Sequence, residues 1–157
     1  MNLQNFQIHG LPFATFQPYF EMTAEELENH GAMMVIAGDD TAPCRVSLAH
    51  AAMGEELLLV SYQHQPAHSP YRATGPIYVR KIAAEASLAP NAIPDQIRCR
   101  LLSVRGYDID DLIVEAEVAE GAVIETIIKR FFDNEQVAYI HLHFARRGCY
   151  AARVDRA

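Results

Sequence analysis

Two histidines separated by one residue are the first candidates for chemistry in this sequence. His141 and His143 lie in the run 137–144, whose pattern predicts a β-strand. Because side chains alternate faces along a strand, both imidazoles share one face, about 6–7 Å apart. That spacing suits two ligands of a metal ion, with a third from His64, His68 or a carboxylate. No HExxH or CxxC motif accompanies the pair, so a metal-dependent enzyme remains an alternative and not our first hypothesis.

Arginines in distant segments suggest a second kind of chemistry. A guanidinium binds a carboxylate or a phosphate through parallel hydrogen bonds. Arginine recurs where the chain is predicted to pass from a loop into a strand, and the loop 64–76, with three prolines, is long for a compact domain. We therefore expect a pocket that binds a small anionic ligand, and the alternative is an ordinary solvated surface. Its candidate residues are Arg45, Arg72, Arg80, Arg153, Tyr71, Tyr78 and His141.

The cysteines offer a third kind of chemistry. Cys149 follows Arg146 and Arg147, and nearby arginines lower the pKa of a thiol and favour the nucleophilic thiolate. With His141 as base, Cys149 could serve a hydrolase or a transferase. The default for a free cysteine is an inert, buried thiol. The three cysteines are odd in number and far apart, and no secretory signal opens the chain, so we expect reduced thiols in a bacterial cytoplasm.

Length and charge limit the classes of function. The 157 residues, half of them apolar and 21% charged, predict one domain over 1–157. A formal charge of −7 argues against nucleic-acid binding, and no apolar run has the roughly 18 residues that a membrane-spanning helix needs. Residues 1–44 contain six acids and no Lys or Arg, whereas the last twelve residues contain four arginines. These ends could attract each other within a chain or across a homodimer, as in an interaction module, and the favoured alternative is an ordinary solvated surface. The sequence does not identify a cofactor.

The elements that must position these residues are mostly strands. A capping box from Thr23 to Glu26 predicts a helix over 24–30, and an apolar stripe predicts a longer helix over 122–132. Strands are expected at 32–37, 57–60, 77–81, 101–107, 112–118, 137–144 and 149–154. Short turns between many of them indicate an α+β fold: a mainly antiparallel sheet with two helices packed on one face.

Alternation along these strands predicts one polar sheet face. Tyr139 lies on the same face of its strand as His141 and His143, opposite the apolar residues. The strand 101–107 likewise places Ser103, Arg105 and Tyr107 together, and the strand 112–118 groups Glu115 with Glu117. If these strands are neighbours, a single face collects His, Arg, Tyr and Glu. The alternative is the wet face of a one-sided antiparallel sheet.

Four stretches of the chain resemble a known bacterial family. They are the run 43–48 (PCRVSL), the pair 69–72 and 75–80 (SPYR and GPIYVR), the run 101–108 (LLSVRGYD) and the ending 141–156. In this order they are similar to the bacterial domain-of-unknown-function family twelve hundred and three, whose members have about this length. The resemblance implies a single bacterial domain and transfers no catalytic residue. The family's ending often carries Arg-Asn where this chain has His143-Phe144, which argues against a metal site that needs the second histidine.

Overall fold

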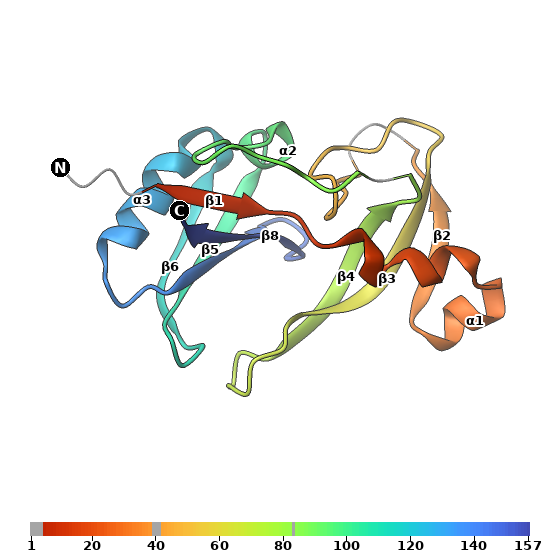
Figure 1. Ribbon diagram of the computed structural model, residues 1–157, viewed down its shortest axis with the longest axis horizontal. Helices are drawn as coiled ribbons and strands as arrows, with labels where there is room; N and C mark the ends of the chain where they lie inside the picture. Colours follow the sequence, from red (N-terminus) through yellow and green to blue (C-terminus); the bar gives the residue numbers. More distant parts are fainter. Residues whose placement is uncertain (1–4, 39–41, 83) are drawn as a thin grey trace.

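Two antiparallel sheets form the framework of the computed structural model, which describes residues 5–38, 42–82 and 84–157. The five-stranded sheet has the order β1-β8-β7-β5-β6, and the three-stranded sheet has the order β2-β3-β4. The strands are β1 Phe6–His9, β2 Ala32–Ile36, β3 Glu56–Gln65, β4 Ala73–Arg80, β5 Leu101–Tyr107, β6 Ile113–Glu120, β7 Tyr139–Phe144 and β8 Tyr150–Arg156. The helices are α1 Ala24–Asn29, α2 Asp95–Arg98, α3 Ile124–Asp133 and the short 3₁₀ helices η1 Phe13–Thr15, η2 Gln17–Glu21 and η3 Gly121–Val123. The sheets follow one another along the long axis (Figure 1).

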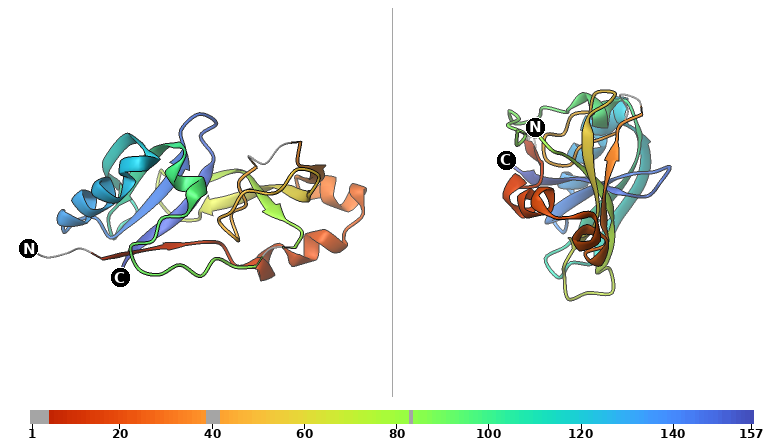
Figure 2. Two further views of the ribbon diagram at one scale, coloured as in Figure 1. Left: turned by 90° about the horizontal axis from the view of Figure 1, so that it is seen from above. Right: turned by 90° about the vertical axis from the view of Figure 1, so that its right-hand side faces the viewer.

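Helix α3 covers one face of the five-stranded sheet (Figure 2, left). Its apolar stripe follows the predicted spacing, and the side chains that it buries are Ile124, Ile127, Ile128, Phe131 and Phe132. They join Leu102 and Val104 of β5 and Ile140 and Leu142 of β7 in the larger hydrophobic core. Gly106 in β5 allows this close packing, since a Cβ there would lie 3.1 Å from the Phe131 ring.

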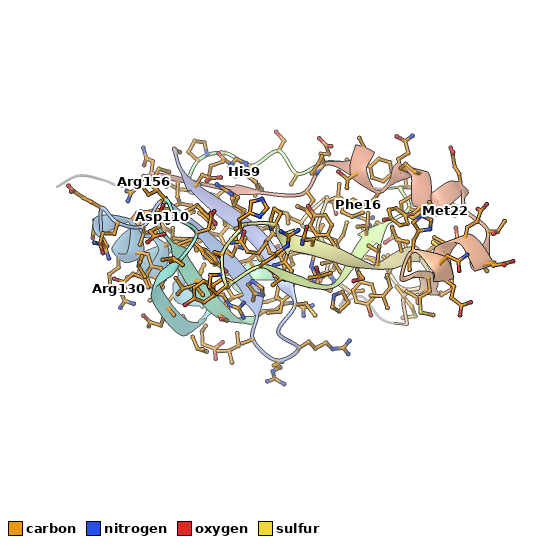
Figure 3. The ribbon with its side chains drawn as sticks, turned by 90° about the horizontal axis from the view of Figure 1, so that it is seen from below. His9, Phe16, Met22, Asp110, Arg130 and Arg156 are labelled. Carbon is orange, nitrogen blue, oxygen red and sulfur yellow. The ribbon has the colours of Figure 1, made fainter. Side chains whose placement is uncertain are left out.

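A second apolar cluster lies under the three-stranded sheet. Here the N-terminal segment packs Phe16 and Leu27 against Val60 of β3 and Ile77 of β4. The predicted capping box is present, because the Thr23 hydroxyl accepts from the Glu26 amide and the Glu26 carboxylate accepts from the Thr23 amide. Figure 3 shows Phe16 and Met22 at this end of the molecule, with Arg130 and Arg156 at the other.

The α+β class and the antiparallel pairing are confirmed, and the arrangement differs in three respects. The strands divide between two sheets, with α1 beside β2 and α3 on the other sheet. An additional strand, β1, pairs with β8 at the edge. Strands β3 and β4 also extend into both ends of the expected loop 64–76, which leaves 66–72 between them. We expected a loop here because proline is uncommon in strands. Pro76 nevertheless lies in β4, which is an edge strand, and edge strands tolerate proline.

The polar face of the five-stranded sheet is covered, not wet. Tyr139, His141 and His143 are only 7%, 3% and 1% exposed. The register pairs Arg105 with His141 and Ser103 with His143, as one shared face requires. The expectation that the glutamates join this face is wrong, because Gly106 pairs with Glu115 and Arg105 with Ala116. Glu117 instead forms an ion pair with Arg130 of α3 on the opposite face.

The helices of the described ranges are short or lie against the sheets. Among them none is long and apolar enough to cross a membrane.

Candidate functional site

Three histidines meet where the two sheets face each other. His64 comes from β3, and His141 and His143 come from neighbouring positions on one face of β7. One potential ligand nitrogen of each ring lies within 4.8 Å of the other two. The rings of His141 and His143 are 6.4 Å apart between centroids, as their strand spacing predicted, and that of His64 lies 5.1 Å from that of His143. Among the candidates for a third metal ligand, His64 lies beside His141 and His143, whereas His68 is exposed in the loop 66–72.

Burial keeps these imidazoles neutral. Desolvation is the main cause that lowers the pKa of His141 to about 3, and His143 and Arg153 act in the same direction. Desolvation also lowers the pKa of His143 to about 4, against the opposing effect of its hydrogen bond to the Gly148 carbonyl. The pKa of His64 is lowered as well, by burial and then by Arg105. Neutral imidazole is the form that binds metal ions.

Each ring leaves one buried nitrogen without a hydrogen-bond partner in the described chain. These atoms are His64 Nδ1, His141 Nδ1 and His143 Nε2. The Nδ1 atom of His143 lies 2.9 Å from the Gly148 carbonyl oxygen, which only an N–H can donate to. In the neutral ring, Nε2 of His143 therefore carries the free lone pair.

Tyrosines and polar side chains hold the cluster in place. The ring of Tyr150 stacks on His64, with centroids 5.5 Å apart, and meets His141 edge-on at 5.2 Å. The Tyr139 hydroxyl donates to Asp111 Oδ1 at 2.6 Å and accepts from Gln65 Nε2 at 3.0 Å. Burial, with the Asp111 hydrogen bond, raises the pKa of Tyr139. These contacts connect β3, β7 and the β5–β6 turn.

An arginine-lined cavity of about 580 Å³ lies at the same junction. The loop that follows residue 42 and the β7–β8 turn extend on one side of the molecule (Figure 2, left) and contribute part of its wall. Its polar wall comprises Arg45, Arg100, Arg146, Arg147, Tyr78 and Cys149, and its apolar wall includes Val35, Leu57, Leu59 and Phe144. None of the described lining residues is acidic, and residues 39–41, between the lining residues Gly38 and Ala42, lie outside the description.

Arg45 is the most buried charge of this wall. It is 2% exposed, and its Nε and Nη1 donate to the carbonyl oxygens of Tyr150 at 2.7 Å and Pro43 at 2.5 Å. Its guanidinium also lies 4.9 Å from the centre of the Phe144 ring. Desolvation lowers the pKa of Arg45 to about 10, so the group remains charged at neutral pH. No described carboxylate forms an ion pair with it.

The other predicted anion-binding residues do not join Arg45 and Tyr78. Nε and Nη2 of Arg80 donate to the Glu55 carboxylate, and the shortest of these hydrogen bonds is 2.6 Å. Arg153 pairs with Asp155 at 2.9 Å and lies over the Tyr139 ring.

Arg72 and Tyr71 are exposed in the loop 66–72, and the ring of Tyr71 meets that of Tyr107. His141 belongs to the histidine cluster. The seven residues are thus spread over several places, and carboxylates pair with two of the four arginines. In the sequence, the two adjacent arginines of the turn Arg146-Arg147-Gly148 were the available sign of an anion-binding site. Only the tertiary structure shows that this turn lines a cavity.

The three cysteines are free thiols. Cys149 lines the cavity, and its Sγ lies 3.9 Å from the Arg147 carbonyl oxygen. Within the described part of the chain, no imidazole is hydrogen-bonded to it, so the structure does not assemble the nucleophile and base considered for Cys149 and His141. Cys44 is buried, and its sulfur accepts from the Arg80 amide at 3.4 Å.

Comparison with known proteins assigns a family without an activity. Searches among curated proteins and among solved structures gave no match. A family model described as protein of unknown function (DUF1203) matches residues 41–156. This range includes the β7–β8 turn at the cavity and the three histidines of the cluster. Since the match spans most of the chain, the protein belongs to the DUF1203 family.

Proposed function

We propose that this protein binds a small organic anion in the arginine-lined cavity. The observation that carries the proposal is Arg45, a buried guanidinium that lines a hollow and has carbonyl oxygens but no described carboxylate as partners. A buried charge is costly unless an opposite charge offsets it. The carboxylate or phosphate of a ligand would supply that charge.

A second arginine lies beside Arg45 at the cavity. The guanidinium carbons of Arg45 and Arg100 lie 4.9 and 4.8 Å from the centre of the same Phe144 ring. Their mutual repulsion contributes to the lowered pKa of Arg45. Arg146 and Arg147 add two exposed guanidiniums at the rim. An anion placed among these groups is attracted by several charges at once.

The shape of the cavity favours a ligand with an apolar part. A volume of about 580 Å³ falls within the range of pockets for small organic molecules. Val35, Leu57 and Leu59 form a wall that a bare inorganic ion would leave empty. We therefore expect an organic acid or a phosphate ester whose charged group faces Arg45.

Isothermal titration of the full chain with acetate, benzoate and inorganic phosphate tests this function. Benzoate should bind more tightly than acetate, because its ring can contact the apolar wall. The double variant Arg146→Ala/Arg147→Ala should weaken benzoate binding at least about tenfold, the loss expected when charge-assisted hydrogen bonds are removed.

The matched control is Arg72→Ala, an exposed arginine on another loop. It should leave the affinity unchanged. Absence of saturable binding by the unmodified protein to any of the three anions, or an equal loss in Arg72→Ala, would refute the proposal. Chloride at the same ionic strength separates specific binding from general charge screening.

A further inference from the structure

We propose that His64, His141 and His143 form a binding site for one divalent transition-metal ion of the zinc class, which links the two sheets. This inference does not depend on the anion-binding cavity. It uses different side chains on a different part of the sheet junction.

The positions of the nitrogens carry the first part of the argument. All three lie within 4.8 Å of one another. Zinc binds histidine nitrogens at about 2.0–2.1 Å, so nitrogens around a tetrahedral ion are about 3.3 Å apart. The ligand nitrogens therefore need to approach one another by about 1.5 Å at most. Such movement is within reach of side-chain rotation, since His64 is only half-buried and comes from the facing sheet.

The unpaired nitrogens carry the second part. A buried polar atom without a partner costs roughly 1–3 kcal/mol, and each of the three clustered rings has one such nitrogen. Hydrogen bonds among three neutral imidazoles cannot account for the arrangement, because none of these three nitrogens has a partner in the described chain. A cation that accepts a lone pair from each ring would satisfy all of them together.

The hydrogen bond of His143 holds its side chain in an orientation suited to binding a metal ion. Its Nδ1–H donates to the Gly148 carbonyl, so the ring orientation is set and Nε2 is left to bind the ion. Metal-binding histidines commonly use their second nitrogen in this manner. The ring of Tyr150 packs against all three imidazoles and restricts their movement further.

The donor set indicates the class of ion. Three imidazoles suit Zn²⁺, Co²⁺, Ni²⁺ or Cu²⁺, whereas Mg²⁺ and Ca²⁺ prefer oxygen ligands. Three protein ligands leave a fourth position for water or another small ligand. Because His64 belongs to β3 and the other two to β7, the bound ion would hold the three-stranded sheet against the five-stranded sheet.

Equilibrium dialysis and calorimetry of the full-length, chelator-treated chain with ZnCl₂ and CoCl₂ test the site. We expect one ion per chain, and a higher melting temperature with ZnCl₂ than with MgCl₂, since an ion that binds only the folded state stabilises it. Co²⁺ should show the intense visible absorption of a tetrahedral site. His64→Gln and His141→Gln should each lower zinc affinity at least about tenfold, because removing even an outer-shell partner of a metal ligand commonly costs about 10–100-fold.

The matched control is His68→Gln, because His68 is exposed and lies outside the cluster. It should bind zinc as the unmodified chain does. Should the ligand variants not fold, nuclear magnetic resonance of the unmodified chain decides: zinc should shift the ring signals of the three cluster histidines and leave those of His9, His30 and His68 in place. No zinc binding by the unmodified chain, or binding that moves only the signals outside the cluster, overturns the proposal.

Discussion

Removing the Tyr139 hydroxyl should destabilise the junction between the sheets. In Tyr139→Phe, the Gln65 amide loses its acceptor and Asp111 loses its donor, whose distances are 3.0 and 2.6 Å. Gln65 is only 3% exposed, so its side-chain N–H group stays buried without a partner. The same substitution keeps the aromatic ring, which stacks on Tyr107 with centroids 5.0 Å apart. The change therefore isolates the polar contacts.

The expected cost follows from these two contacts. A buried donor left without an acceptor costs about 1–3 kcal/mol, and a hydrogen bond to a charged group contributes a similar amount. Because Asp111 is partly exposed and can turn to water, we expect a total of about 2–3 kcal/mol. For a chain of this length, that corresponds to a decrease of roughly 4–12 °C in melting temperature.

Urea denaturation monitored by circular dichroism measures this cost. The midpoint should fall while the dependence on urea stays the same, because the folded state keeps its burial. Tyr71→Phe is the matched control, since Tyr71 is exposed and its hydroxyl has no described hydrogen bond. Adding Gln65→Leu to Tyr139→Phe should recover part of the loss by removing the stranded donor. A cost below about 0.5 kcal/mol for Tyr139→Phe would refute the reasoning.

Two further predictions concern charge and close packing. The hydrogen bond from Arg80 lowers the pKa of Glu55, so this pair stabilises the protein above the ordinary glutamate pKa, and the contribution is lost as the pH falls through the lowered value. Glu55→Gln should therefore reduce the loss of stability that occurs between about pH 5 and pH 3. The control Glu56→Gln, at an exposed position, should leave that loss unchanged. Urea midpoints measured across this pH range test both expectations. Gly121→Ala should cost about 3 kcal/mol, because the new Cβ would overlap backbone carbonyl oxygens at the end of α2. Thermal unfolding of this variant beside Gly38→Ala, where a Cβ meets nothing within 4 Å, measures the difference, and equal melting temperatures would contradict the packing argument.

Local patterns in the sequence were sufficient for most elements. Helix α3 forms where apolar residues recur at helical spacing, and α1 begins at the predicted capping box, because both signals act within a few residues. The shared face of His141 and His143 was likewise predictable, since alternation is a property of any strand. β1 was missed because a strand of four residues carries little pattern of its own and depends on its pairing with β8.

Contacts between distant segments decided the rest. The register of β5 against β6 placed Glu115 and Glu117 on the α3 face, and a shift of one residue would have reversed them. Arg80 and Arg153 look equivalent to Arg45 in sequence, yet only Arg45 is without a described carboxylate partner.

The histidine cluster shows the same division. The sequence by itself determined that His141 and His143 share one face, because the two-residue repeat of a strand is local. It left the third partner open among His64, His68 and the carboxylates. Only the packing of one sheet on the other selected His64, since burying the face of β7 against β3 is a long-range event that no local spacing encodes.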